Sequence, residues 1–270
     1  LASQAARNAL QEANIGPHDI DAVLISTCTG YLCPGLTSYV IEQIGLRPDV
    51  LALDLVGQGC GAAIPNLRTA EALLAAGRAQ HVLSICVEVC SAAFYVDEDP
   101  GVLISACLFG DGAGAAVLSA KPGTTQQSIE WIASETLTNP ADRDLLRFEQ
   151  KNGMLRNILS RQVPVLAARY AKTVLNKMLE RKELTQGDIS GWVWHGGGKN
   201  VLDALQKQLA LSDSDVLISR AIMSSHGNLS SAFVYFVLKA AMAHQPRTGW
   251  WWMSSFGAGF SCHGALLKVT

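Results

Sequence analysis

The chain has few charged residues and no block of basic ones. Only 16% of its 270 residues are charged, and the formal net charge is -2. Such a sequence offers no basic stretch for a phosphate backbone, which argues against nucleic acid as the main partner. Hydrophobic residues make up 49% of the chain, but no apolar run is long enough to cross a bilayer. We therefore expect a large core and no stable membrane insertion.

Features of an exported precursor or a metal site are also missing. The chain begins at Leu1 inside a helical pattern, without an initiator Met and without signal- or transit-peptide character, so we expect part of its natural start to be absent. Seven cysteines at irregular spacings favour reduced thiols and a cytoplasmic location. Because they lack paired C-x-x-C spacing and a matching His pair, no metal site is expected.

Apolar strands alternate with helical patterns along the chain. Residues 2–14 and 38–44 are predicted to be helices. Buried strands are predicted at residues 22–26, 50–55 and 79–90. This alternation predicts an α/β fold with a mostly parallel or mixed sheet. The polar, aperiodic stretch 136–153 is predicted to be a surface loop.

The second half of the chain repeats the pattern of the first. The matching stretches are Asp19-Ile20 with Asp188-Ile189, residues 22–26 with 191–195, and Gly59-Cys60 with Gly227-Asn228. Similarity at such a long period predicts two related βαβ-type halves packed about a pseudo-dyad. Chance similarity between alanine-rich helices is the alternative. The boundary is expected near residues 119–126, which gives domains 1–122 and 123–270.

Cys60 lies between two glycines, after an apolar strand and before a helical pattern. A thiol at a helix N-terminus faces free N–H groups and the positive end of the helix dipole, which favours the thiolate. The alternative is an inert core cysteine, a common fate of cysteines in apolar surroundings. Cys60 is thus a candidate nucleophile.

His195 and Asn228 occupy places that the repeat relates to the candidate nucleophile. His195 ends a predicted strand before three glycines, and Asn228 begins a helix as Cys60 does. A structural His and a helix-capping Asn are the plain alternatives. Parallel strands would bring all three residues to one crevice. There a thiolate could attack a thioester, paired with an imidazolium, while the Asn amide and the His N–H donate to an oxyanion.

These motifs together resemble the type III polyketide synthases, the chalcone and stilbene synthase family, and suggest a bacterial-type member. The matching stretches are Gly59-Cys60-Gly61, Leu108 to Ala113, Trp194 to Gly197, Gly227 to Ala232, and Ser255 to Gly259. Their order runs through nearly the whole chain. The resemblance implies a thiolase-like fold of two related halves in α-β-α-β-α layers, the first half lacking its N-terminal part.

The resemblance also implies the chemistry. An acyl-CoA would load Cys60, and His195 with Asn228 would promote decarboxylation of malonyl-CoA and stabilise the enolate. Repeated condensation and cyclisation would give an alkylresorcinol-, alkylpyrone- or chalcone-like product. Family members are homodimers that use free CoA thioesters and need no carrier protein, cofactor or metal.

The resemblance implies a substrate cavity as well. Phe109 would be the gatekeeper between the CoA tunnel and the cavity. The residues expected to line or shape the cavity are Ser230, Phe256, Gly257 and Gly259.

Several positions depart from the family pattern. A second gatekeeper Phe is expected near Arg156-Asn157, and neither residue is aromatic. Cavity positions that plant enzymes often fill with Thr are Cys28, Cys90 and Ala93 here. A less polar, wider cavity suits an aliphatic starter. Cys33 falls where the family places a residue that reaches into the partner's cavity.

Three other functions are alternatives to a type III polyketide synthase. A ketoacyl-ACP synthase III shares the Cys-His-Asn set but would condense once, with a carrier protein. Phe109 and the run from Asn228 to Ser231 favour the polyketide synthase. A degradative thiolase is disfavoured, because its second cysteine precedes a run of glycines, whereas Cys262 follows Gly257 and Gly259. A non-catalytic α/β binding or scaffold protein would leave Cys60 inert.

Overall fold

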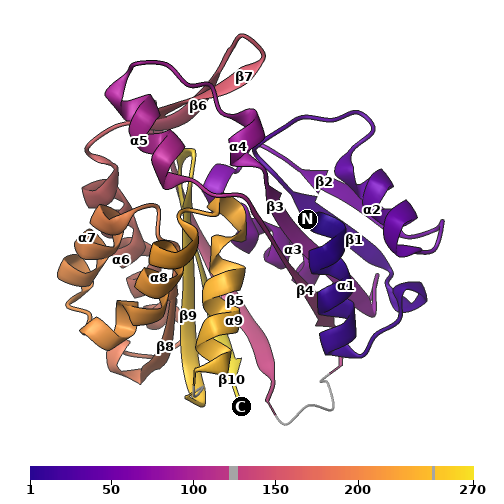
Figure 1. The fold of residues 1–270 in the computed structure, drawn as a ribbon. Coiled ribbons are helices and arrows are strands. Elements are labelled where there is room, and N and C mark those ends of the chain that lie inside the picture. The colour runs from indigo at the N-terminus through magenta and orange to yellow at the C-terminus, as the bar shows by residue number, and fades with distance from the viewer. Residues whose placement is uncertain (122–126, 245–246) are drawn as a thin grey trace.

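Two four-stranded sheets form the framework of the molecule (Figure 1). The computed structural model describes residues 1–121, 127–244 and 247–270. In spatial order, the first sheet consists of β2 (Leu51–Leu55), β1 (Ala22–Ser26), β3 (His81–Glu88) and β4 (Gly112–Ser119). The second consists of β5 (Ile129–Arg143), β10 (Gly259–Val269), β9 (Gly249–Gly257) and β8 (Ile189–Trp194). The expected boundary near 119–126 lies largely outside the described residues.

Three strands of one sheet are equivalent to three of the other. β1 runs parallel to β3, and β3 runs antiparallel to β4. Likewise β8 runs parallel to β9, and β9 antiparallel to β10. The 3₁₀ helices η1 (Pro17–Asp19) and η3 (Gln186–Asp188) precede β1 and β8 in the same way. The internal repeat predicted from the sequence is therefore confirmed.

Helices cover both outer faces and fill the space between the sheets. α1 (Ala2–Ala13) and α2 (Leu36–Ile44) lie outside the first sheet, and α6 (Val163–Arg181) with α7 (Lys199–Leu209) outside the second. α3 (Ala63–Ala75) and α9 (Phe233–Ala243) lie between them. The remaining helices are α4 (Cys90–Ala93), α5 (Pro100–Leu108) and α8 (Asp213–His226). The predicted α-β-α-β-α layering is confirmed.

Successive side chains along a strand pack into the two layers on opposite faces of the sheet. In β1, Val23 and Ile25 face the core beneath α1 and α2, whereas Ala22 and Leu24 face α3. A strand with apolar residues on both faces must be covered on both sides, as in other layered α/β folds. The central core joins the halves, because α3 and α9 pack there against strands of both sheets.

The strand predicted at 50–55 forms, but it is not buried. β2 lies at the edge of its sheet and pairs with β1, and most of its residues are half-buried or exposed. Leu51 is 44% exposed. The apolar run thus indicated the strand correctly and its burial wrongly, because an apolar run cannot distinguish an edge from a centre.

The loop predicted at 136–153 is wrong. Part of β5 and all of β6 (Leu146–Lys151) lie in this stretch, and β6 forms a hairpin with β7 (Met154–Leu159). β5 is an edge strand, which tolerates Pro140 because one side of its backbone needs no partner. Most of these residues are half-buried, so hydrophobic alternation is weak and the sequence gives no clear strand signal.

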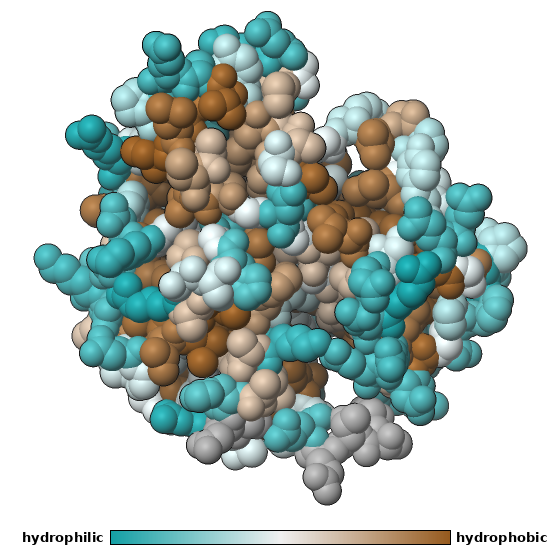
Figure 2. Space-filling view, viewed as in Figure 1, coloured by the Kyte–Doolittle hydropathy of each residue, from teal (hydrophilic) through white to brown (hydrophobic). Residues whose placement is uncertain are grey.

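The surface of α5 is apolar. This helix exposes Leu103 and Ile104, and apolar residues gather over it in Figure 2.

Over the described residues, none of the helices combines the length and the apolar character that crossing a bilayer requires.

Candidate active site

The three residues expected to carry chemistry lie at the ends of equivalent elements. Cys60 lies in the 3₁₀ turn η2 (Gly59–Gly61), which leads into α3. Asn228 lies just before η4 (Ser230–Ala232), which leads into α9. His195 directly follows β8. All three residues are buried.

The Ser230 hydroxyl donates to the Cys60 Sγ over 3.3 Å. The side-chain amide of Asn228 lies close enough to lower the pKa of the thiol. Ser230 thus links the two halves at the point where the repeat predicted that they would meet. The nucleophile candidate and its amide partner are therefore brought together by the structure.

The expected thiolate at Cys60 is wrong for this geometry. Burial raises the pKa of the thiol to about 12, and the charge of Glu88 raises it further, while Ser230 and Asn228 only partly oppose these effects. Desolvation of the charged form thus outweighs the helix N-terminus. Cys60 is a neutral thiol at pH 7, and its proton has to leave when the sulfur attacks a carbonyl.

Backbone contacts fix the orientation of Asn228. Its N–H donates to Leu108 O over 2.8 Å, and its carbonyl accepts from Gly110 N over 3.0 Å. Its side-chain Oδ1 accepts from the backbone N–H of Ser230 over 2.9 Å. Because this bond holds the amide oxygen at Ser230, the NH₂ group points away from it and can donate to Cys60 or to an acyl group bound there.

His195 is buried as a neutral imidazole. Its backbone N–H donates to Ser254 O over 2.9 Å, and its ring stands edge-on to Phe233 at 5.4 Å. Burial lowers the pKa of His195 to about 4. Nδ1 has no hydrogen-bond partner among the described residues. Within the same residues no hydrogen bond joins His195 to Cys60, so the expected thiolate–imidazolium pair is not formed.

Glu88, which our sequence reasoning missed, organises the polar side of the site. The carboxyl group at the end of β3 is fully buried and accepts bonds from Cys28 N at 3.0 Å and Thr29 Oγ1 at 2.9 Å. It also accepts from the hydroxyls of Ser230 and Ser231. A glutamate inside an apolar strand run was the available signal, since a buried carboxyl group needs several partners.

Of the predicted cavity residues, Cys28 and Cys90 lie near Cys60. Cys28 Sγ is 3.5 Å from Ser230 Oγ, the same oxygen that contacts Cys60. Burial first, and then the charge of Glu88, raises the pKa of both thiols, and Cys60 contributes to each. Cys90 begins α4, which ends at Ala93.

Cys33 lies apart from this group. It is exposed in the loop before α2. Its expected reach into a partner's cavity stays a prediction.

Glycines let the segment 255–259 pack directly beneath the nucleophile turn. A Cβ on Gly61 would lie 3.0 Å from the backbone of Gly257, and one on Gly257 would lie 2.3 Å from Gln58 O. Ser255 Oγ donates to Gly61 O over 3.1 Å. The two backbones thus meet at a distance that only glycine permits.

Phe256 and Gly259, the other predicted cavity residues of this segment, flank the contact between Gly61 and Gly257. Gly259 has a φ of 121°, which favours glycine. Phe256 lies in the core of the second half together with Phe260. Its expected place in a substrate cavity stays a prediction.

Phe109 belongs to a row of aromatic rings beside Asn228. Its backbone forms a bridge with Asn228, and its ring lies 5.0 Å from Phe94. Phe94 in turn lies 5.5 Å from Phe148 of β6. Phe148 pairs with Asn157 across the hairpin, so an aromatic ring does occur beside the position where the family pattern expects a second one.

Two protein families match this chain over most of its length. The family described as "FAE1/Type III polyketide synthase-like protein" matches residues 2–180, and the C-terminal domain of chalcone and stilbene synthases matches residues 136–270. The chain belongs to the type III polyketide synthase family, as the sequence motifs predicted.

Individual relatives agree with this family. A 3,5-dihydroxyphenylacetyl-CoA synthase of Amycolatopsis orientalis is 31% identical over 228 residues, 84% of this chain and 62% of that protein. One of Streptomyces toyocaensis is 29% identical over 242 residues, 87% of this chain and 62% of that protein. The chain therefore spans less than two thirds of the length of these curated relatives.

Solved structures confirm the thiolase-like fold. PKS-I of the brown alga Ectocarpus siliculosus superposes with a TM-score of 0.91 and 28% identity, covering 98% of this chain and 73% of that one. Germicidin synthase of Streptomyces coelicolor gives a TM-score of 0.93 and 25% identity, covering 100% of this chain and 71% of that one.

Proposed function

We propose that the protein is a type III polyketide synthase that extends an acyl-CoA starter with malonyl-CoA. The observation that carries this proposal is the position of Ser230, whose hydroxyl donates to the Cys60 thiol over 3.3 Å and whose backbone N–H donates to Asn228 Oδ1 over 2.9 Å, so that both residues are held at one buried site. A thiol nucleophile beside a fixed amide donor suits attack on a thioester and stabilisation of the oxyanion that forms.

In the proposed first step, the Cys60 sulfur attacks the thioester carbonyl and CoA leaves as the thiol. Because the pKa of Cys60 is raised, the proton of the thiol needs an acceptor as the S–C bond forms. His195 is neutral at pH 7 and has a free ring nitrogen, so it can take that proton. Its low pKa favours passing the proton on to the leaving thiolate.

In the proposed second step, malonyl-CoA loses CO₂ next to the acylated Cys60. The electron pair of the broken C–C bond becomes an enolate, whose oxygen is stabilised by the Asn228 amide and an N–H of His195. The enolate carbon attacks the Cys60 thioester, and the C–S bond to Cys60 breaks. The Cys60 sulfur leaves and takes up a proton, and the chain, now two carbons longer, is attached to the CoA that carried the malonyl group. Transfer of that chain back to Cys60 releases this CoA and allows the next extension. Repetition and cyclisation give the ring. The curated relatives support a resorcinol-type ring, since their name contains a 3,5-dihydroxyphenyl group.

We further propose the arrangement and setting of the enzyme. It acts as a cytoplasmic homodimer on free CoA thioesters, without metal or cofactor, with domains at 1–122 and 123–270. Small or weakly polar side chains at Cys90 and Ala93 support an aliphatic starter, and Phe109 beside Asn228 supports a gate between the CoA arm and the cavity.

The direct test is incubation of the full-length enzyme with malonyl-CoA and a panel of aliphatic and aromatic acyl-CoAs, with product masses recorded. Products that contain two or more malonyl-derived units on a starter support the proposal. Products with one such unit support a single-condensation enzyme instead, and the absence of any condensation product contradicts both.

A further inference from the structure

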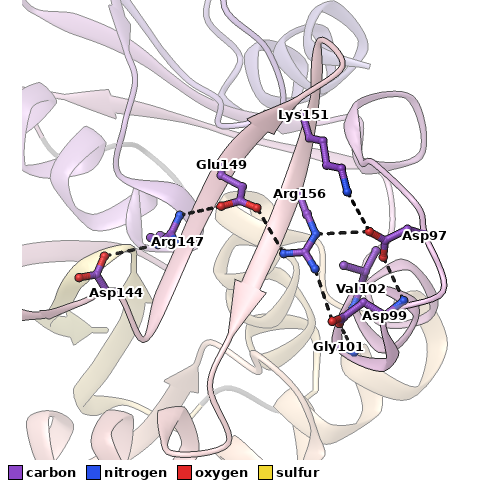
Figure 3. A network of polar contacts seen from close by, with 9 residues as sticks. All are labelled: Asp97, Asp99, Gly101, Val102, Asp144, Arg147, Glu149, Lys151 and Arg156. Carbon is purple, nitrogen blue, oxygen red and sulfur yellow. Dashed lines mark hydrogen bonds and ion pairs between the residues drawn. The ribbon is translucent and has the colours of Figure 1, made fainter.

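The β6–β7 hairpin is clamped over the segment between α4 and α5. Arg156 of β7 binds Asp97 at 3.5 Å, Asp99 at 3.4 Å and Glu149 at 3.3 Å (Figure 3). The Arg156 side chain is 18% exposed, so its ion pairs are only partly screened by solvent. The hairpin is thus held in one position relative to α5.

Asn157 lies on the face of the hairpin that carries the aromatic row. It pairs directly with Phe148 across the hairpin, and side chains of paired residues project to the same face. From Phe148 the rings continue through Phe94 to Phe109, whose backbone bridges to Asn228. A row of aromatic rings therefore connects Asn157 with Asn228 at the candidate active site.

The free atom of the Asn157 amide is its oxygen. Nδ2 lies 2.9 Å from Ser105 Oγ, and Ser105 donates its single proton to Gly101 O over 2.9 Å. Ser105 can only accept from Asn157, so the amide nitrogen must point toward it. Oδ1 is then left buried without a hydrogen-bond partner among the described residues.

A buried acceptor without a partner destabilises a protein, and Asn157 is only 4% exposed. A ligand that relieves this cost must bring an N–H or O–H donor into apolar surroundings. The pantetheine arm of CoA fits, because it is a chain of methylenes interrupted by two amides. The amide nearer the sulfur is two carbons from the thioester that Cys60 would attack.

We propose that Asn157 Oδ1 accepts a hydrogen bond from the amide N–H nearest the sulfur of a bound acyl-CoA, an inference that rests on the proposed function. The rings of Phe94, Phe109 and Phe148 contact the methylenes around that amide. Asn157 is accordingly a substrate-binding residue that places the thioester relative to Cys60.

Three thioesters of one acyl group separate this role from a structural one. Asn157→Leu keeps the volume of the side chain and removes the acceptor. Acylation of Cys60 is followed by intact-protein mass with the acyl-CoA, the N-acetylcysteamine thioester, which keeps the N–H, and the S-butyl thioester, which lacks it. Loss of one neutral hydrogen bond predicts a reduction in kcat/KM of about 3- to 10-fold for the first two thioesters. We expect less than twofold change for the third.

Thermal unfolding supplies the control for folding. Asn157→Leu removes an unsatisfied buried acceptor but also the bond from Nδ2 to Ser105 Oγ, two effects of opposite sign, so its Tm should stay close to that of the unaltered protein. An equal reduction of kcat/KM for all three thioesters shows a structural amide and overturns the inference while the proposed function stands. If no thioester acylates the unaltered protein, the proposed function is overturned together with this inference.

Discussion

Ser230 connects the groups around the candidate nucleophile. Its hydroxyl contacts Cys60, Cys28 and Glu88, and its backbone N–H holds the Asn228 amide. Ser230 has a φ of 50°, a conformation that costs energy for a residue with a Cβ and is frequent at functional sites. The site therefore depends on a residue whose main-chain geometry is unusual, which no sequence pattern indicates.

At the residue scale, Asn228 should act as a donor rather than as a spacer. Asn228→Ala removes the donor, and malonyl-CoA decarboxylation should fall about 100- to 1,000-fold, as for loss of one oxyanion-hole donor. Asn228→Asp is the matched variant, because it keeps an acceptor for Ser230 N and exchanges the NH₂ group for oxygen. Release of labelled CO₂ measures both. Activity of Asn228→Asp equal to that of the unaltered protein would contradict the donor role.

Two buried histidines should make the protein less stable in acid. Burial, with a smaller effect of Arg68, lowers the pKa of His263 to about 4, and burial does the same for His195. Between pH 6.5 and 4 the unfolded chain binds more protons at these residues than the folded one, so the free energy of unfolding falls as pH falls.

His263→Gln separates the two contributions. Each histidine contributes about 1.4 kcal/mol per pH unit in this window, or about 2 kcal/mol between pH 6.5 and 5. The variant should lose that much less stability over the same interval, measured by urea unfolding at both pH values. An unchanged pH dependence would show that His263 is not buried in its neutral form.

At the element scale, the nucleophile turn depends on close backbone packing. Gly61→Ala places a Cβ 3.0 Å from Gly257 and 3.1 Å from the ring of His263. Overpacking of this kind costs about 1–3 kcal/mol. A displacement of the turn by about 1 Å can reduce the rate about 100-fold. We expect a lower Tm and a slower acylation of Cys60.

Gly30→Ala is the control for this variant, since a Cβ at Gly30 meets nothing within 4 Å. Its Tm and acylation rate should match those of the unaltered protein, with a stability change of at most about 0.5 kcal/mol. Equal behaviour of the two alanine variants would show that the approach of Gly61 to Gly257 is not needed.

Elements with a clear hydrophobic period could be predicted from the sequence, and others could not. The helix over 2–14 and the strand over 22–26 form where their patterns place them, because each buries at least one well-defined face. β6 and the end of β5 lack such a face, and the sequence predicts a loop over this stretch, 136–153. Their position depends on contacts with α4 and α5, such as the ion pairs of Arg156, which are distant in sequence.

At the scale of the whole molecule, the internal repeat gave most of the site. Equivalent turns before α3 and α9 place Cys60 and Asn228 beside Ser230, which bonds to both, where the sequence predicted that the two turns would meet. Protonation states could not be predicted in this way, because they depend on burial. The helix start suggested a thiolate, whereas desolvation at the joint between the halves makes the thiol the stable form.

In the proposed reaction Cys60 carries the acyl chain, and the most direct test is to find that chain on the protein. The full-length enzyme is incubated with an acyl-CoA, digested and mapped by mass spectrometry. We predict one acyl adduct on the peptide that contains Cys60. Cys60→Ala should show no adduct and no condensation, yet still release some CO₂ from malonyl-CoA, because His195 and Asn228 remain. An adduct on another residue, or full condensation activity in Cys60→Ala, would contradict the account.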